Sequence, residues 1–292
     1  MRIKTGLLIL AGLILLLACS SVEALLAPLQ APAQAPVKTP ILATEAGSLP
    51  GLEPAAQDSA LPAGNEQTAP GAAAQEAILI LEPGPGSRVL SPLHVTGWAD
   101  PTFEQTLLAR VLRTDGSLLI DQPIQIAADM GQRGPFGADL PFSVTEAENV
   151  LVQILDISAR DGGVVHLASV GVTLLPGGDE VLSQAGLAEE RLQIFRPAPG
   201  ETIRGGRVLV EGYGLASFEN SLVVEVYDAG GARVGFTPCM TSAQEPGEMG
   251  TFSVEVEYNV SLEGPGRVSV VDTLPVFDGV GHVTSVVVTL AP

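Results

Sequence analysis

The sequence predicts an all-β protein in which one module occurs twice, and three observations support this prediction. Glycine and proline are abundant, with 33 and 23 residues, whereas aromatic residues make up only 4% of the chain. Such a composition is typical of many short strands joined by turns. Apolar residues alternate with polar ones, for example from Phe136 to Phe142, which is the period of a half-buried strand. Finally, a Val-x-Gly-aromatic strand, a turn with Phe-Glu and an alternating strand occur in this order at 95–112 and again at 210–227.

The first predicted module spans residues 77–175 and contains strand candidates bounded by Gly, Pro, Asn, Asp or Ser. Thr114-Asp115-Gly116 is a hairpin signal, because Asp-Gly supplies the positive φ angles that tight hairpin turns require. About seven short strands in roughly 100 residues are typical of an immunoglobulin-like β-sandwich. The strands are expected at 78–81, 93–99, 106–113, 117–127, 136–142, 150–157 and 164–175.

The second predicted module spans residues 192–292 and repeats this plan. The residues that match between the modules are the apolar ones at alternate positions, such as Phe252 with Phe136, whereas the intervening residues differ. Shared inward residues and divergent outward residues are expected of a duplicated sandwich, because a register slip of one residue would expose the core. A short acidic connector, residues 176–191, joins the modules, and a short helical segment is expected over 181–191.

The N-terminal part predicts export and membrane attachment. Residues 1–19 are predicted to be a lipoprotein signal peptide, with Arg2 and Lys4 at its start and an apolar run after them. Its end, Leu16-Leu17-Ala18-Cys19, resembles the signal box of bacterial lipoproteins, and a diacyl or triacyl anchor on Cys19 would suffice for stable attachment. An uncleaved anchor and an ordinary secretory signal are the alternatives. Residues 20–76, rich in Ala and Pro, are predicted to be a disordered linker that lifts the modules off the membrane.

Charge and composition exclude several classes of function. The net charge of −19 leaves no basic patch for nucleic acid. Both lysines, Lys4 and Lys38, precede the modules, which excludes Schiff-base and phosphate-loop lysine chemistry in the folded part. The motifs of zinc hydrolases, serine hydrolases, dithiol redox proteins and phosphate loops do not occur. The sequence therefore predicts no enzyme activity, no cofactor and no metal site.

A set of short motifs occurs once in each module. They are Pro-x-Pro-Gly at 83–86 and 197–200, Val-x-Gly at 95–99 and 210–214, Phe-Glu at 103–104 and 218–219, Gly-x-Phe at 134–136 and 250–252, and Asp-Gly at 161–162 and 278–279. As a set, these motifs make both modules resemble the immunoglobulin-like domain named for bacterial spore germination proteins. The resemblance implies a sandwich fold, an exported or lipid-anchored envelope protein, and a binding or scaffolding role with no known active site.

Histidine and cysteine give only weak signals. His94, His166 and His282 are too few and too scattered to predict a metal site. His166 and His282 lie at matched places, and we expect surface histidines at strand ends, with a ligand or pH-sensing role as the alternative. Cys239 is the only cysteine left once Cys19 carries lipid, so we expect a small apolar residue near a strand, with dimerisation through Cys239 as the alternative.

Two matched pairs of residues in the repeated motif are candidate functional groups. Trp98 and Tyr213 alternate out of phase with the inward valines of their strands, so their rings should lie on the outer face. There they could bind a sugar or a peptide, or a loop could fold over them. Glu104 and Glu219 follow Phe in a turn, and we expect their carboxylates to accept backbone N–H bonds that hold the turn. A calcium or ligand contact is the alternative for these carboxylates.

These observations predict an extracytoplasmic protein, lipid-anchored to the bacterial cell membrane through Cys19. We expect its paired immunoglobulin-like modules to bind or scaffold an envelope protein or glycan without catalysis, in a context such as sporulation or germination. A passive structural spacer at the cell surface is the alternative.

Overall fold

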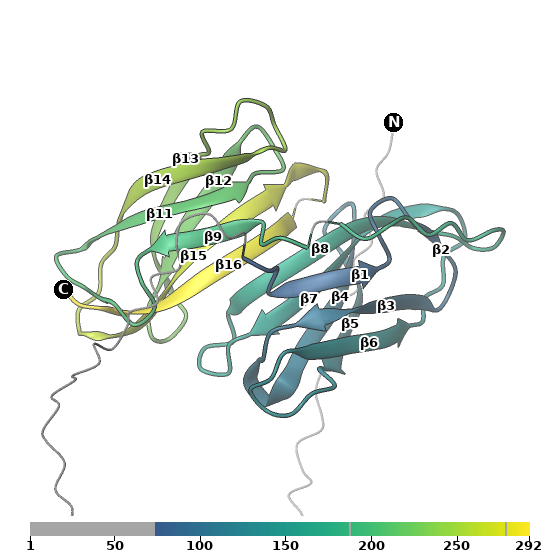
Figure 1. Cartoon of the computed structure of the whole chain (residues 1–292), viewed down its shortest axis with the longest axis horizontal. Coiled ribbons are helices and arrows are strands. Elements are labelled where there is room, and N and C mark those ends of the chain that lie inside the picture. Colours follow the sequence, from purple (N-terminus) through teal and green to yellow (C-terminus); the bar gives the residue numbers. More distant parts are fainter. Residues whose placement is uncertain (1–73, 187, 278) are drawn as a thin grey trace, which may run out of the picture. The chain divides into compact units, whose positions relative to one another are not determined.

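The computed structural model describes residues 74–186, 188–277 and 279–292. The predicted signal peptide with Cys19, and the predicted linker up to residue 73, lie outside these described residues. The described chain consists of strands β1 to β16 with two short 3₁₀ helices, which confirms the all-β prediction (Figure 1). None of the helices in this described part is both long and apolar enough to span a bilayer.

The first module is a sandwich of two sheets. One sheet has the strand order β1-β3-β6, and the opposite layer has the order β8-β7-β4-β5, with the short β2 paired in parallel with β8. The elements are β1 (Ile78–Glu82), β2 (Arg88–Val89), β3 (Leu93–Ala99), η1 (Phe103–Gln105), β4 (Thr106–Arg113), β5 (Leu118–Gln125), β6 (Gly134–Leu140), β7 (Glu148–Ile157) and β8 (Val164–Leu174).

The second module repeats this sandwich. Its sheets have the orders β9-β11-β14 and β16-β15-β12-β13, and β10 pairs in parallel with β16. The elements are β9 (Leu192–Arg196), β10 (Thr202–Ile203), β11 (Arg207–Leu215), β12 (Ser221–Tyr227), β13 (Arg233–Met240), β14 (Met249–Glu257), β15 (Gly264–Leu274), η2 (Pro275–Phe277) and β16 (Gly279–Leu290).

The connector differs from its prediction. The helical segment expected over 181–191 is wrong, because the described residues of this stretch form no helix. Instead, Val181 forms an isolated antiparallel bridge with Arg88, and Glu189 forms one with Gln75. Backbone pairing with the first module therefore satisfies hydrogen-bonding groups that a helix would have satisfied internally.

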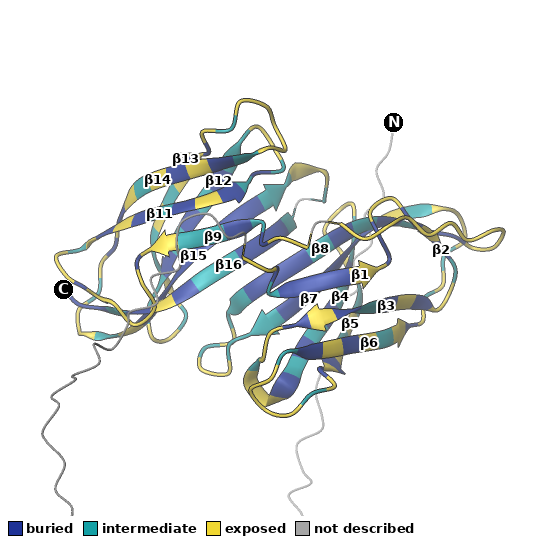
Figure 2. Ribbon diagram, in the orientation of Figure 1, coloured by how far each residue is buried: buried dark blue, intermediate teal, exposed yellow. Residues whose placement is uncertain are grey.

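Each sandwich has its own core, built from the inward-facing residues at alternate positions along its strands (Figure 2). The repeated Val-x-Gly motif has a packing role here. A Cβ atom on Gly97 would overlap the Phe136 ring of the neighbouring strand, and one on Gly212 would overlap the matched Phe252 ring. The glycine is therefore required because an aromatic ring lies directly against its backbone.

The two sandwiches share one sheet. Strands β8 and β16 pair antiparallel at Leu167 and Val283, so the order β5-β4-β7-β8-β16-β15-β12-β13 continues from the first module into the second. The described residues of both modules accordingly belong to one compact unit. The pairing places matched residues of the two modules opposite each other, which is the relation found across a two-fold axis.

The outward face of the shared sheet is apolar where the modules meet. Leu155 and Leu167 from the first module pack with Val271 and Val283 from the second, and all four are buried. Matched serines add a hydrogen bond on each side of the axis: Ser169 Oγ donates to the Gly281 carbonyl at 2.6 Å, and Ser285 Oγ donates to the Val165 carbonyl at 2.7 Å. The junction is therefore a packed interface that both modules build in the same way.

Candidate functional site

The candidate site lies at the module junction, where the segments that precede the first strand of each module run side by side. The backbone N–H of Glu76 donates to the Ala188 carbonyl at 2.9 Å, and the N–H of Glu190 donates to the Ala74 carbonyl at 2.8 Å. This antiparallel pairing holds the two glutamates next to each other. The last residues of the predicted linker and of the predicted connector thus belong to the folded body.

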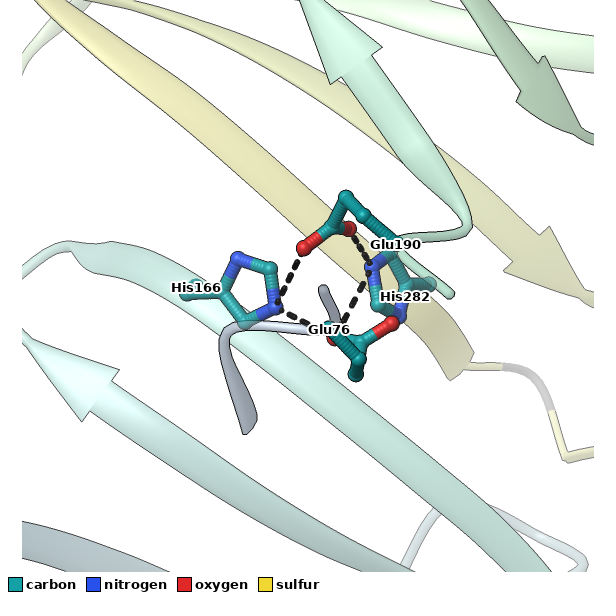
Figure 3. A group of neighbouring side chains, drawn as sticks. All are labelled: Glu76, His166, Glu190 and His282. Carbon is teal, nitrogen blue, oxygen red and sulfur yellow. Dashed lines mark hydrogen bonds and ion pairs between the residues drawn. The ribbon is translucent and has the colours of Figure 1, made fainter. Parts of the chain in front are cut away.

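Two histidines complete the site. His166 and His282 come directly before Leu167 and Val283, the pair at which β8 and β16 meet. Strand pairing therefore brings both imidazole rings to the axis between the modules. Their ring centroids are 5.0 Å apart and their planes are nearly perpendicular, at 88°. We call Glu76, His166, Glu190 and His282 the junction cluster (Figure 3).

Within the junction cluster, each histidine has one near and one more distant carboxylate. His166 Nε2 lies 2.8 Å from Glu76 Oε1 and 3.8 Å from Glu190 Oε2. His282 Nε2 lies 2.9 Å from Glu190 Oε1 and 3.7 Å from Glu76 Oε1. One nitrogen or oxygen atom from each residue lies within 4.8 Å of the others. The four side chains therefore form one cluster instead of two separate pairs.

The junction cluster is buried, and the backbone holds its carboxylates in place. None of its residues is more than 7% exposed. Glu190 Oε2 accepts a hydrogen bond from the backbone N–H of Ala77 at 3.1 Å, and Glu76 Oε2 accepts one from that of Arg191 at 3.3 Å. Each carboxylate thus accepts a hydrogen bond from the backbone at the start of the other module. This exchange fixes the orientation of both carboxylates.

The two histidines differ in their proton affinity. Burial lowers the pKa of an imidazole, because the charged form loses its hydration. At His166, a hydrogen bond to Glu76 and the charges of Glu190, Glu76 and Asp156 outweigh burial, and the pKa lies above its ordinary value. At His282, burial dominates and lowers the pKa to about 3. His166 therefore holds a proton more readily than an ordinary histidine, and His282 less readily.

The surroundings of the two histidines also differ. Asp272, the strand partner of His282, is fully buried and accepts hydrogen bonds from the N–H and Oγ of Ser217 and from Arg191 Nη2. Asp156, the matched partner of His166, is only partly buried. Burial raises the pKa of both carboxyl groups. The cluster is therefore bordered by further carboxylates, with Arg191 as a neighbouring cation.

This arrangement supports two kinds of chemistry. Imidazole nitrogens and carboxylate oxygens are ligands for divalent transition metals. The same groups can also form a metal-free network of hydrogen bonds and ion pairs. The prediction that His166 and His282 are surface residues is wrong, because both are buried. Their matched position was the signal, but Glu76 and Glu190 were missed because they precede the first strands and belong to no periodic pattern.

A groove of about 470 Å³ lies on the opposite, outward face of the shared sheet. Residues from both modules line it, and most of the lining is apolar, for example Leu112, Val164, Val223 and Phe236. Beside the groove, a buried ion pair between Asp161 and Arg267 joins the two modules. Both carboxylate oxygens of Asp161 accept hydrogen bonds from Arg267 Nη1 at 3.0 Å.

The predicted aromatic pair lies elsewhere. Trp98 on β3 is 43% exposed and Tyr213 on β11 is 36% exposed, on the three-stranded sheets away from the shared sheet. Neither ring belongs to the junction cluster or to the lining of the groove. Cys239 is buried in the core of the second module, and burial raises the pKa of its thiol to about 11.

The repeated turn is held by amide side chains. Glu104 and Glu219 adopt positive φ angles of 54° and 49°, and within the described part of the chain their carboxylates make no hydrogen bond. The next residue in each turn makes the contacts instead. Gln105 Nε2 donates to the carbonyls of Asp129 and Gln132 at 3.1 and 2.9 Å, and Asn220 Nδ2 donates to that of Ala243 at 3.0 Å. The brace expected from the carboxylates is therefore supplied one position later.

Comparisons with known proteins concern the modules themselves. Three solved structures are similar at low identity: titin domains Z1Z2 in complex with telethonin (14% identity, 74% of this chain and 96% of that chain, TM-score 0.18), red sea bream transglutaminase (12%, 72% and 31%, 0.24) and bovine butyrophilin (12%, 73% and 97%, 0.21). The comparison with curated proteins gives no match. Residues 77–163 and 191–275 each match the family described as the immunoglobulin-like domain of bacterial spore germination. These segments make up more than half of the chain, which therefore belongs to this family of immunoglobulin-like domains.

Proposed function

We propose that this protein is a non-catalytic lipoprotein of the bacterial cell envelope whose paired modules bind or scaffold an extracytoplasmic protein. Family membership supports a setting related to spore germination. The signal box that ends at Cys19 supports a lipid anchor, and the Ala/Pro-rich residues 20–73 supply a spacer between that anchor and the modules.

The groove on the shared sheet carries this proposal. Its volume of about 470 Å³ lies within the usual range for ligand sites, and such sites are common at domain interfaces. Pairing of β8 with β16 creates the groove, so neither module could form it alone. The apolar lining favours a partner that inserts apolar side chains. A glycan is less favoured, because many of its hydroxyl groups would be buried against the apolar part of the lining, which offers them no hydrogen bond.

Site-specific photocrosslinking in the native envelope tests this proposal. A benzophenone amino acid replaces Phe236, which lines the groove and is 51% exposed, in the full chain. The same replacement at Trp98 probes the outer aromatic face. Replacement of Phe195, which is 56% exposed and does not line the groove, is the matched control. We expect one recurrent protein adduct from position 236, and its loss when Val223→Arg places a long charged side chain in the groove.

Three other outcomes would contradict this proposal. Adducts from position 98 alone would move the binding surface to the aromatic pair. An adduct from position 236 that persists in the Val223→Arg chain would show that the groove is not the contact. No adduct from either position would favour the passive spacer, for which the continuous shared sheet is also suited because it makes the two modules one body.

A further inference from the structure

We propose that Glu76, His166, Glu190 and His282 form a closed site for one divalent transition-metal ion of the zinc type, which ties the two modules together. This inference is independent of the partner proposed above, because the cluster and the groove lie on opposite faces of the shared sheet.

The spacing of the four side chains fits a tetrahedral ion. With metal–ligand bonds of about 2.0–2.1 Å, the ligand atoms of a tetrahedral zinc site are about 3.3 Å apart. The nitrogen–oxygen distances in the junction cluster are 2.8, 2.9, 3.7 and 3.8 Å, and the 2.9 and 3.8 Å contacts use the two different oxygens of Glu190. With one ligand atom taken from each residue, all four atoms lie within 4.8 Å of one another. The widest of these separations, at most 4.8 Å, would have to contract by up to about 1.5 Å, which side-chain rotation can supply. The four side chains therefore already surround the position that an ion would occupy.

The charge of the junction cluster also favours a divalent cation. Two glutamates lie in a region where no member is more than 7% exposed, and Asp272 beside them is fully buried. Burying carboxylates is costly unless their charge is compensated. One divalent ion bound by two neutral imidazoles and two carboxylates forms a complex with no net charge. Arg191 lies next to Asp272, at 3.3 Å, and is already engaged there.

The ligand types select the class of ion. Two imidazoles make calcium and magnesium unfavourable, because these ions prefer six or more oxygen ligands. Zinc accepts nitrogen and carboxylate ligands in a tetrahedron, and four protein ligands with no open position are typical of a structural site. Hydrogen bonds from the backbone N–H groups of Ala77 and Arg191 orient the carboxylates, as is common for metal ligands. A cavity of about 90 Å³ lined by Glu76 and His282 offers a path of entry.

Direct metal binding to the full chain tests this site. The chain is stripped with a chelator, dialysed and titrated with Zn²⁺, and bound metal is counted by elemental analysis. We expect one zinc per chain and a melting temperature about 5–10 °C higher when zinc is at 100 times its dissociation constant. His166→Gln and His282→Gln should each weaken zinc binding more than about tenfold. The matched control is His94→Gln, which removes an exposed histidine paired with Asp139 and should bind zinc like the wild type.

Spectroscopy keeps the test decisive if a histidine variant fails to fold. Cobalt(II) in the wild-type chain should give the visible bands of a tetrahedral ion, and the zinc absorption edge should show nitrogen and oxygen ligands without sulfur. Absence of bound zinc in the folded wild type would overturn the proposal. So would a sulfur ligand, which would assign the metal to Cys239 or Cys19, or equal zinc affinity in the His94→Gln and His282→Gln chains.

Discussion

Because the two modules share one sheet, we predict that a destabilising substitution in the core of one module also lowers the stability of the other. Val270 on β15 is fully buried in the core of the second module. Truncation by Val270→Ala removes packed methyl groups and should lower the free energy of unfolding by about 2–3 kcal/mol. The only tryptophan of the chain, Trp98, lies in the first module and reports on that module by its fluorescence.

The junction is strong enough to transmit this change. Leu155, Leu167, Val271 and Val283 are at most 7% exposed, and each buried side chain of this size contributes about 1.5–3 kcal/mol. Together they contribute about 6–12 kcal/mol, an upper value because the unfolded chain also buries apolar surface. This exceeds the loss caused by Val270→Ala. Neither module should therefore unfold while the other stays folded.

Urea unfolding of the full chain measures this coupling with two probes. Trp98 fluorescence follows the first module, and far-ultraviolet circular dichroism follows the strands of both. With a dependence of about 2–3 kcal/mol per molar urea, Val270→Ala should lower the midpoint by about 1 M. We expect the two probes to give the same midpoint before and after the substitution, because a single cooperative unit shows coincident transitions.

Two different midpoints from the two probes would contradict this prediction. If Val270→Ala left the Trp98 midpoint unchanged while circular dichroism became biphasic, the modules would be independent and the junction weak. Val111→Ala, in the core of the first module and also fully buried, is the matched control because it must shift the Trp98 transition in either case.

Three further predictions concern single sites. Asp161→Asn should lower the free energy of unfolding by about 3–5 kcal/mol, because it leaves Arg267 buried without its partner. Burial alone would raise the pKa of Asp161, but hydrogen bonds from Arg267, Ser158 and Gly163 hold it well below its ordinary value. The stability that this pair contributes is thus present above about pH 4 and is lost as the pH falls further. The difference in free energy of unfolding between variant and wild type, measured in urea, should therefore shrink towards pH 3. A difference that stays constant over this pH range would refute the assignment. Gly97→Ala should lower the free energy of unfolding in urea by more than about 3 kcal/mol, because its Cβ would overlap the Phe136 ring, whereas Gly177→Ala has open space and should change little. Cys19→Ala should abolish incorporation of labelled palmitate and move the protein from the membrane to the soluble fraction; retention in the membrane would point to an uncleaved anchor.

The strands and their inward faces could be predicted because alternation is a local signal. Matched apolar residues such as Phe136 and Phe252 indicated the same face in both modules, and both lie in the cores. The junction also has a signal in the sequence, which is harder to recognise because it departs from simple alternation. The run from Val150 to Leu155 is nearly continuous in apolar residues, as expected of a strand covered on both faces. Leu151 and Leu155 are indeed buried on the outward side of the sheet.

The junction cluster could not be assembled from the sequence, since its members come from two kinds of place. Two glutamates lie in segments without periodicity, and two histidines lie near the starts of strands whose partner strand belongs to the other module. A sequence pattern places a residue within its own module only. Which strand edges meet is decided by long-range pairing of β8 with β16, and nothing near His166 or His282 encodes that choice.

The same symmetry explains why four ligands arise so readily here. Near a two-fold axis, each residue meets its own counterpart, so one glutamate and one histidine per module are enough for a set of four. Some buried residues of the shared sheet have diverged between the modules: Arg267, which binds Asp161, corresponds to Leu151 in the first module. Near the axis several polar counterparts are identical, with glutamate at 76 and 190, histidine at 166 and 282, and serine at 169 and 285, whereas the apolar Leu155 and Leu167 correspond to Val271 and Val283. A simple hydrogen-bonded pair would require identity in neither module, because each Glu–His contact could be replaced by an apolar pair at little cost. Two glutamates and two histidines that converge at the axis are what a jointly bound ion requires, since removing any one ligand leaves the other three buried charges and dipoles without their common partner.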